Sequence, residues 1–224
     1  MKYTWLLFDA DDTLFDFSKA ESNALKWTLE QSGLPFQPEY IQKYSQFNQQ
    51  VWQEFERGEV TQRDLRWKRF HLFFESIGHQ GDMHAIGQLY TRNLAKGIDL
   101  LEDAEEVIRS CKKQYQLALV TNGLKDVQVP RLAGSSLSDC FDKVFISEEI
   151  GAAKPTRAYF DAVFSGINQP ARESVLIIGD SLTSDIQGGI EYGIDTCWYN
   201  PGQKPSELPI TYQITRLKDL LTLL

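Results

Sequence analysis

The chain has 224 residues, of which 42% are apolar and 24% are charged, a composition typical of a globular protein with a sizeable core. Its net charge of -8 and sequence pI of about 5.0 argue against a general attraction to nucleic acid polymers or anionic membranes. The three cysteines, Cys111, Cys140 and Cys197, lie far apart without a CxxC pair, which argues against a disulfide framework or a zinc–thiolate site.

Targeting and membrane signals are not apparent in the sequence. The N-terminal apolar run "WLLF" is too short for a signal peptide. No apolar run approaches the roughly 20 residues of a membrane span. We therefore expect a cytoplasmic protein, either monomeric or weakly dimeric.

The first predicted strand covers residues 4–9 and runs directly into the acidic stretch "DADDTLFD". Asp9, Asp11 and Asp12 are crowded there although like charges repel one another. Such crowding needs a physical reason, either a bound cation or an ordinary turn that caps a helix. Free backbone N–H groups in "DDTLF" could also form an anion-binding nest.

The next segment, residues 17–97, shows helical patterns and no convincing strand. Ser18 with Glu21, and Thr61 with Asp64, have the spacing of capping boxes that begin the first and third helices. We expect the three predicted helices to end at glycines, which favour the left-handed C-cap conformation. These are Gly33, Gly58 and Gly78.

After this segment, short apolar runs alternate with helical patterns, as in βαβ units. The runs are continuous, which favours parallel strands that are covered on both faces. Including the first, strands are expected at residues 4–9, 117–121, 143–147, 174–180 and 196–199. Helices are expected at about 103–114, 125–134, 156–166 and 183–193.

The predicted fold is therefore α/β, with a Rossmann-like parallel sheet, helices on both faces and an inserted all-helical domain. Residues 1–16 and 98–224 would form the α/β core. Residues 17–97 would form the insert, which contains 13 of the 27 aromatic residues.

Ligands of open parallel sheets bind at the carboxyl ends of the strands. Asp9, Thr121 and Asp180 end three predicted strands, and Lys154 lies in the loop after a fourth. Carboxylate oxygens are the ligands that Mg²⁺ prefers, and a hydroxyl with an ammonium suits a phosphoryl group. The sequence thus predicts a magnesium and phosphate site at this edge.

The four segments "DADDT", "LVTNG", "AAKP" and "GDSLTSD" resemble, in order and spacing, the four motifs of the haloacid dehalogenase-like (HAD) superfamily. The resemblance covers nearly the whole chain, and the helical insert is similar to that family's α-helical cap. The first motif has Asp12 where the commonest form has glycine. "DDTLFDF" resembles a subgroup that contains pyrimidine 5'-nucleotidases.

This resemblance implies that Asp9 is the nucleophile, which forms an aspartyl-phosphate. It implies that Asp11 protonates the leaving group and then activates water. Asp9, the Asp11 backbone carbonyl and Asp180 would bind Mg²⁺, with Mn²⁺ as a substitute. Asp185 would support the metal directly or through water.

The remaining motif residues would bind the substrate. By the same resemblance, Thr121 and Lys154 hold the transferring phosphoryl group, and Asn122 lies beside them as a further substrate-binding residue. Asp12 is interpreted as a loop or helix-cap group that takes no part in the reaction.

The predicted function is a Mg-dependent phosphomonoesterase for a small phosphorylated metabolite. A nucleoside 5'-monophosphate is expected, with pyrimidines preferred because of the subgroup resemblance. The alternatives are a phosphatase for sugar phosphates, a haloacid dehalogenase, a phosphosugar mutase and a non-catalytic binding module. A dehalogenase needs neither a metal nor the second aspartate, whereas this sequence retains Asp11 and Asp180.

Overall fold

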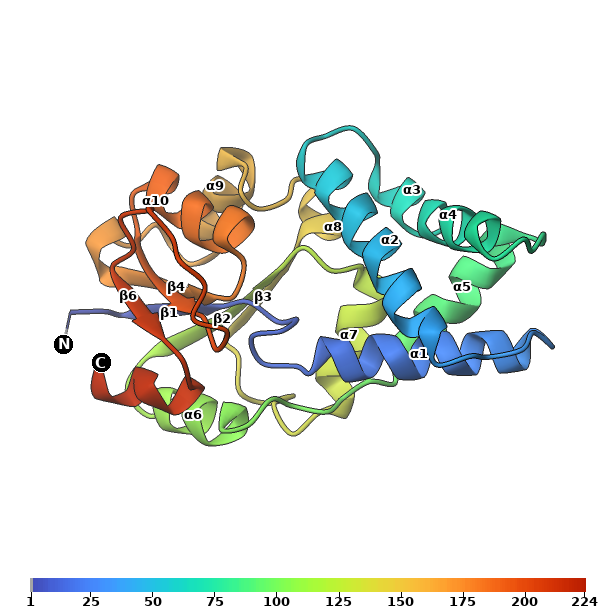
Figure 1. Ribbon diagram of the computed structural model, residues 1–224. Coiled ribbons are helices and arrows are strands. Elements are labelled where there is room, and N and C mark those ends of the chain that lie inside the picture. The colour runs from blue at the N-terminus through green and yellow to red at the C-terminus, as the bar shows by residue number, and fades with distance from the viewer. Residues whose placement is uncertain (1) are drawn as a thin grey trace. The chain divides into compact units, whose positions relative to one another are not determined.

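The structure is a computed structural model that describes residues 2–224 (Figure 1). The chain divides into two compact units. The first, an α/β unit, contains the chain up to Asp16 together with Asp99–Lys125 and Leu132–Leu224. The second, a helical unit, contains Phe17–Ile98 and Asp126–Arg131.

The α/β unit contains a six-stranded sheet in the order β3-β2-β1-β4-β5-β6, and all neighbouring strands are parallel. The strands are β1 (Trp5–Phe8), β2 (Gln116–Thr121), β3 (Lys143–Ile146), β4 (Val175–Gly179), β5 (Asp195–Tyr199) and β6 (Tyr212–Ile214). All five predicted strands are present. The sequence prediction missed β6, because three residues are too few to show a period at a sheet edge.

Helices cover both faces of this sheet. They are α6 (Ala104–Cys111), α7 (Lys125–Gly134), which spans both units, α8 (Ser147–Ile150), α9 (Arg157–Gly166) and α10 (Gly188–Tyr192), with short helical turns η1 (Arg172–Ser174), η2 (Leu182–Gln187) and η3 (Leu217–Thr222). Leu6 and Phe8 belong to a core cluster with residues of α6 and η3. Leu7, on the opposite face, belongs to a second cluster with residues of α9. The predicted α/β class is confirmed.

The helical unit contains α1 (Phe17–Gln31), α2 (Glu39–Glu56), α3 (Gln62–Leu65), α4 (Lys68–Ser76) and α5 (Met83–Leu94). The three predicted glycine stops are confirmed, since all have positive φ: Gly33 (70°), Gly58 (73°) and Gly78 (67°). Within residues 2–224, no helix is both long and apolar enough to cross a membrane.

Of the two predicted capping boxes, only the second forms. The Thr61 hydroxyl accepts a hydrogen bond from the Asp64 backbone, and the Asp64 carboxylate accepts one from the Thr61 backbone. Ser18 instead lies inside α1, which begins at Phe17. Glu21 is buried, and its carboxylate accepts a hydrogen bond from Asn48 Nδ2 at 2.7 Å.

The predicted third helix is broken into α3 and α4. The break follows Leu65, where α5 approaches closely: a Cβ atom at Gly87 would lie 2.1 Å from the Arg66 carbonyl oxygen. This helix crossing is a tertiary contact, so the local sequence pattern could not reveal it.

The core of the helical unit is aromatic. Tyr44, Phe70 and Tyr90 are fully buried, and their ring centroids lie 5.0–5.3 Å apart. Beside them, the Asn48 amide bridges two buried charged groups, since Arg69 Nη1 donates to Asn48 Oδ1 at 2.9 Å and Asn48 Nδ2 donates to Glu21. Asn48 therefore supplies a hydrogen-bond partner to both Glu21 and Arg69. Among the described residues, these two side chains form no direct ion pair with each other.

Asn48→Ala should lower the free energy of unfolding by about 2–4 kcal/mol, because it removes one hydrogen-bond partner from each of two buried charged groups. Urea unfolding followed by circular dichroism measures this change. Gln49→Ala, at the neighbouring exposed position of α2, is the matched control and should change the stability by less than about 0.5 kcal/mol. Equal stabilities for the two variants would contradict this account.

Candidate active site

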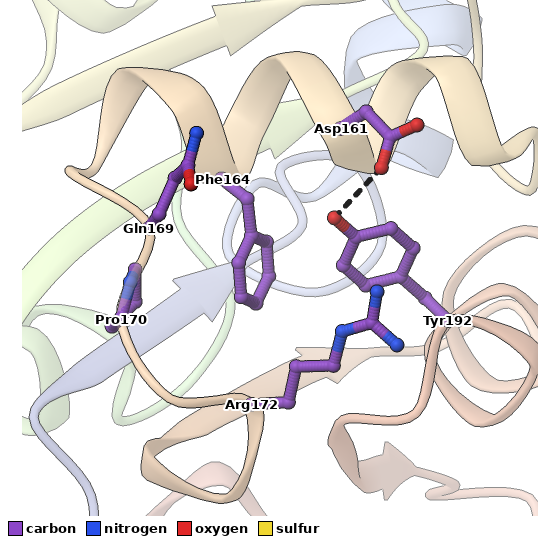
Figure 2. Close-up of a pocket in the computed structure, with 6 residues that line it drawn as sticks. All are labelled: Asp161, Phe164, Gln169, Pro170, Arg172 and Tyr192. Carbon is purple, nitrogen blue, oxygen red and sulfur yellow. Dashed lines mark hydrogen bonds between the residues drawn. The ribbon is translucent and has the colours of Figure 1, made fainter.

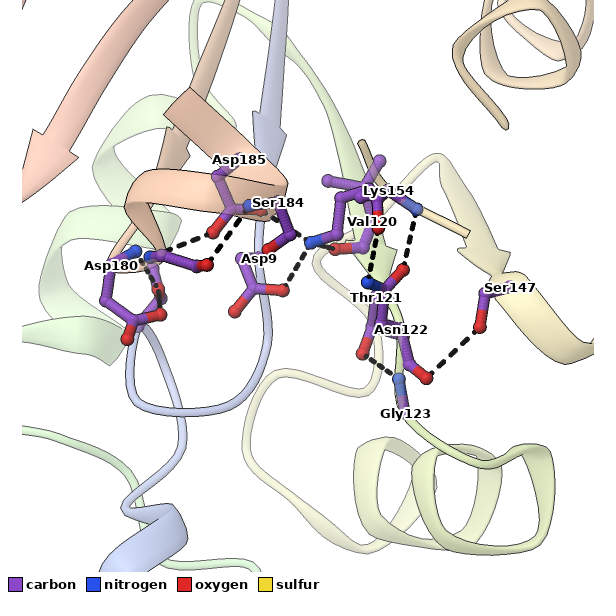
Figure 3. Close-up of polar contacts among 12 residues, drawn as sticks. Asp9, Val120, Thr121, Asn122, Gly123, Ser147, Lys154, Asp180, Ser184 and Asp185 are labelled. Carbon is purple, nitrogen blue, oxygen red and sulfur yellow. Dashed lines mark hydrogen bonds and ion pairs between the residues drawn. The ribbon is translucent and has the colours of Figure 1, made fainter. Parts of the chain in front are cut away.

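The predicted site residues follow the strands of the α/β unit. Asp9 follows β1, Thr121 ends β2 and Asp180 follows β4. Because β1 lies between β2 and β4 and all three are parallel, their carboxyl ends share one edge of the sheet. Figure 3 shows Asp9, Asp180, Asp185 and Lys154 side by side at this edge.

Three carboxylates meet here. Asp9, Asp180 and Asp185 each offer an oxygen that lies within 4.8 Å of the others. Asp9 and Asp185 are buried, and Asp180 is half-buried. Burial raises the pKa of Asp9 well above its usual value, and the neighbouring carboxylates of Asp185 and Asp180 raise it further against the opposing charge of Lys154. Burial, followed by the charges of Asp185 and Asp12, raises the pKa of Asp180 to about 7.

Lys154 compensates part of this charge. Its side chain is 1% exposed, and its Nζ donates to Asp9 Oδ1 at 2.6 Å, Asp185 Oδ1 at 2.7 Å and the Val120 carbonyl at 2.8 Å. Burial alone would lower the pKa of Lys154, yet the Asp185 and Asp9 carboxylates raise it above its usual value. Lys154 therefore stays charged, and all three of its N–H groups are engaged with the protein.

Asp185 lies on η2, a turn of π-helix. Its fully buried Oδ2 accepts a hydrogen bond from the Ser181 backbone N–H at 3.2 Å. A Cβ atom at Gly179 would lie 2.2 Å from the same oxygen. Only glycine at the end of β4 therefore allows the Asp185 carboxylate to pack against the strand.

Thr121 and Asn122 have different surroundings. Thr121 Oγ1 accepts a hydrogen bond from the Gly123 N–H at 3.0 Å, which leaves the hydroxyl hydrogen available for donation. The Asn122 side chain forms a reciprocal pair with the Lys154 backbone, at 2.9 Å to its carbonyl and 2.8 Å from its N–H. The Ser147 hydroxyl, which sequence reasoning missed, donates to the Asn122 carbonyl at 3.1 Å. Asn122 thus contacts the loop that carries Lys154.

The loop after β1 is a tight turn. Asp11 is half-buried, and its backbone bridges to Phe15. Asp12 has a φ of 56°, a left-handed conformation that glycine adopts most easily and Asp tolerates. The N–H groups of Asp12, Leu14 and Phe15 donate to carbonyls of the same loop. The expected anion nest is therefore wrong for these three groups, because the turn itself consumes them.

Two further side chains that sequence reasoning missed hold Asp180. Thr13 Oγ1 accepts from the Asp180 N–H at 3.1 Å and donates to Asp180 Oδ1 at 3.2 Å. Trp198 Nε1, on β5, donates to the Asp180 carbonyl at 2.8 Å. Thr13 follows the first aspartates directly, but no local signal connects Trp198 with the site.

A pocket of about 430 Å³ lies elsewhere in the α/β unit (Figure 2). It is lined by Asp161, Phe164, Gln169, Pro170, Arg172 and Tyr192. Arg172 precedes β4 and Tyr192 precedes β5, so the pocket lies at the amino ends of the strands, away from the carboxylates. The Arg172 guanidinium stacks over the Tyr192 ring at 4.4 Å, and the Tyr192 hydroxyl donates to Asp161 at 2.9 Å. The polar side chains of Arg172, Tyr192 and Asp161 thus interact with one another. We assign no reaction to this pocket.

The donor set at the carboxyl edge has a clear chemistry. Its oxygens come from carboxylates, with neither histidine nor cysteine among the clustered groups. Hard divalent cations such as Mg²⁺ prefer such ligands, whereas zinc sites favour nitrogen and sulfur. Three carboxylates and one ammonium leave two negative charges, which equals the charge that one such cation would neutralise.

Known proteins resemble the chain over its full length. The chain is 40% identical to the HAD-hydrolase YfnB of Bacillus subtilis, over 100% of this chain and 96% of the relative. It is 36% identical to the pyrimidine 5'-nucleotidase PynA of Streptococcus pneumoniae, over 99% and 94% of the two chains. It is 31% identical to the pyrimidine 5'-nucleotidase YjjG of Escherichia coli, over 100% and 99%.

The fold agrees with these sequence relationships. The crystal structure of YfnB, bound to magnesium, matches with a TM-score of 0.94 at 39% identity, covering 100% of this chain and 99% of that one. The model of the haloacid dehalogenase-like hydrolase family matches residues 6–199, a range that contains every residue of the site. The chain therefore belongs to the haloacid dehalogenase-like hydrolases and is an enzyme of that family.

Proposed function

We propose that this enzyme is a Mg²⁺-dependent phosphomonoesterase that hydrolyses nucleoside 5'-monophosphates through an aspartyl-phosphate. The observation that carries the proposal is the buried cluster of Asp9, Asp180, Asp185 and Lys154 at the carboxyl edge of the sheet. Two pyrimidine 5'-nucleotidases that align with nearly the whole chain support the substrate class.

Asp9 is the proposed nucleophile. One of its oxygens is fixed by Lys154, which orients the carboxylate. The other attacks phosphorus, so that an Asp9–phosphate bond forms while the bond to the leaving oxygen breaks. Thr121 donates its free hydroxyl hydrogen to the transferring phosphoryl group. The Lys154 ammonium adds a fixed positive charge beside the same carboxylate.

Asp11 is the proposed general acid and base. Its proton passes to the leaving alkoxide in the first half-reaction, and its carboxylate removes a proton from water in the second. The resulting hydroxide attacks phosphorus, releases inorganic phosphate and restores the Asp9 carboxylate. Asp11 is half-buried, so part of the residue is accessible to water.

Asp9, Asp180 and Asp185 are the proposed metal-binding side chains, with the Asp11 backbone carbonyl as a further ligand. A bound Mg²⁺ would neutralise charge on the carboxylates and on the transferring phosphoryl group. The magnesium bound in the YfnB structure is consistent with this assignment, and Mn²⁺ is the expected substitute because it also accepts oxygen ligands.

The domain assignment follows from the same family resemblance. We take residues 1–16 and 98–224 as the catalytic core and residues 17–97 as the cap that selects the substrate. Asn122 is retained as a candidate substrate contact, although its side chain already holds the Lys154 backbone. The dehalogenase alternative is disfavoured because that reaction uses neither Asp11 nor a metal.

Asp11→Asn should reduce kcat/KM for UMP by about 10²–10⁴-fold, since it removes the proton donor and general base. The loss should be much smaller for the first step with 4-nitrophenyl phosphate, because a phenolate with a low pKa needs little protonation. Burst kinetics on both esters measure this step. Asp99→Asn, at an exposed position, is the control. Equal losses in the first step on both esters would contradict the acid role.

Mg²⁺ should raise the melting temperature, and the increase should grow from pH 5 to pH 8. In the metal-free protein, burial raises the pKa of Asp9 and that of Asp180, the latter to about 7. Between about pH 4 and pH 7 the folded state therefore holds more protons than the unfolded chain, and its stability falls as the pH rises. Mg²⁺ competes with these protons, so it stabilises most where they have left.

Differential scanning fluorimetry in chelator, and with added Mg²⁺ or Mn²⁺, measures this effect. Asp180→Asn should lose most of the metal-induced increase, whereas Asp99→Asn should keep it. Chelator should also abolish turnover, and either cation should restore it. A metal-induced increase that is the same at pH 5 and pH 8 would be evidence against this cluster as the binding site.

The substrate proposal is tested by kcat/KM for UMP, dTMP, AMP and glucose 6-phosphate under one set of conditions. The pyrimidine nucleotides should be hydrolysed fastest, since both nucleotidase relatives are named pyrimidine 5'-nucleotidases. A tenfold preference for the sugar phosphate would reject the nucleotide proposal and leave the phosphatase proposal standing. Phosphate transfer to a second sugar hydroxyl, with no free phosphate, would indicate a mutase.

A further inference from the structure

Asp180 is held by side chains from both neighbouring strands. Thr13, in the loop after β1, exchanges two hydrogen bonds with the Asp180 N–H and Oδ1. Trp198, on β5, donates its indole N–H to the Asp180 carbonyl. These bonds engage the backbone N–H, the backbone carbonyl and one carboxylate oxygen of Asp180. We call Thr13 and Trp198 together the Asp180 clamp.

Both clamp residues are rigidly placed. Thr13 is 0% exposed and Trp198 is 2% exposed. Trp198 is paired with Gly179, the residue before Asp180, in the ladder between β4 and β5. The clamp therefore ties Asp180, which follows β4, to the loop after β1 and to β5.

The clamp leaves one oxygen of the carboxylate open. Within residues 2–224, Thr13 bonds to Oδ1 of Asp180, and no hydrogen bond is formed to Oδ2. The Thr13 hydroxyl fixes the rotation of the carboxylate, and the Trp198 indole fixes the backbone that carries it. An oxygen held in this way requires little reordering when it binds a cation.

We propose that Trp198 and Thr13 are positioning residues that set the affinity of the site for its divalent cation by orienting Asp180. The inference rests on the proposed function, which places Asp180 among the metal ligands. Neither clamp residue contacts the reacting atoms. Partners that orient metal ligands typically contribute a factor of about 10–100 to metal affinity.

A purely structural explanation must be distinguished from this one. A buried indole N–H needs a hydrogen-bond acceptor in any case, and the Asp180 carbonyl could serve only that need. Trp5 is a matched control in the same sheet, since it is also buried, with 5% exposure. It begins β1 and therefore lies at the opposite end of that strand from Asp9. Trp5→Phe makes the same chemical change far from the carboxylates.

The experiment is isothermal titration of Mg²⁺ alone into the metal-free full-length protein. Trp198→Phe keeps an aromatic ring but removes the N–H, and Thr13→Val removes only the hydroxyl. Both should raise the Kd for Mg²⁺ by about 10–100-fold. Thr13→Ser, which retains the hydroxyl, and Trp5→Phe should stay within about threefold of wild type. Circular dichroism and thermal unfolding in chelator establish that each variant is folded.

Saturating Mg²⁺ should largely restore kcat in Trp198→Phe, because this residue acts through the metal site and not on the substrate. Wild-type Mg²⁺ affinity in both Trp198→Phe and Thr13→Val would overturn the clamp while leaving the proposed phosphatase intact. Equal weakening by Trp5→Phe would overturn it as well, by showing a general packing effect. A wild-type protein that binds no Mg²⁺ would reject the proposed metal site and the clamp together.

Discussion

The site depends on one buried ammonium, that of Lys154, which lies between the carboxylates of Asp9 and Asp185. Without this ammonium, burial of two adjacent carboxylates would cost several kcal/mol per charge. The Lys154 ammonium holds the Asp9 and Asp185 carboxylates in place. When the Asp180 carboxylate is included, three negative charges face one positive charge, which leaves two negative charges uncompensated. This remainder supports the proposed cation site. Burial, together with the neighbouring carboxylates, favours protonation of Asp9 and Asp180 in the metal-free form.

Lys154 can act in this way only because the surrounding backbone is fixed. The Asn122 amide pairs with both polar groups of the Lys154 backbone, and Gly179 opens the space that the Asp185 carboxylate fills. On the other side, Thr13 and Trp198 hold Asp180. Lys154 and Asp180 are thus oriented by neutral residues on neighbouring strands or loops, whereas Asp9 is oriented by the Lys154 ammonium itself.

The sequence predicted the parts of the molecule that follow from local pattern. Continuous apolar runs placed five strands, and parallel pairing then brought Asp9 and Asp180 to one edge. β6 was missed because it has only three residues, and the break between α3 and α4 arises from a crossing at Gly87 that no local signal encodes. The same limit applies to Trp198, since its indole reaches Asp180 only across the sheet. The proposed role of Asp11 came from the resemblance to a family, whereas Lys154 was already placed at the predicted phosphate site by its position in the loop after a strand.

The packing of the helical unit restricts how a nucleobase could be recognised. Five of its 13 aromatic residues are fully buried in the core of this unit: Tyr44, Phe70, Phe73, Phe74 and Tyr90. Their ring faces contact one another and Arg69, so none is available to stack on a base. Within the helical unit, exposed ring surface is therefore left to the eight half-buried aromatic residues, which include Phe17, at the start of α1. Substitutions at these partly exposed positions would leave the aromatic core of the helical unit intact.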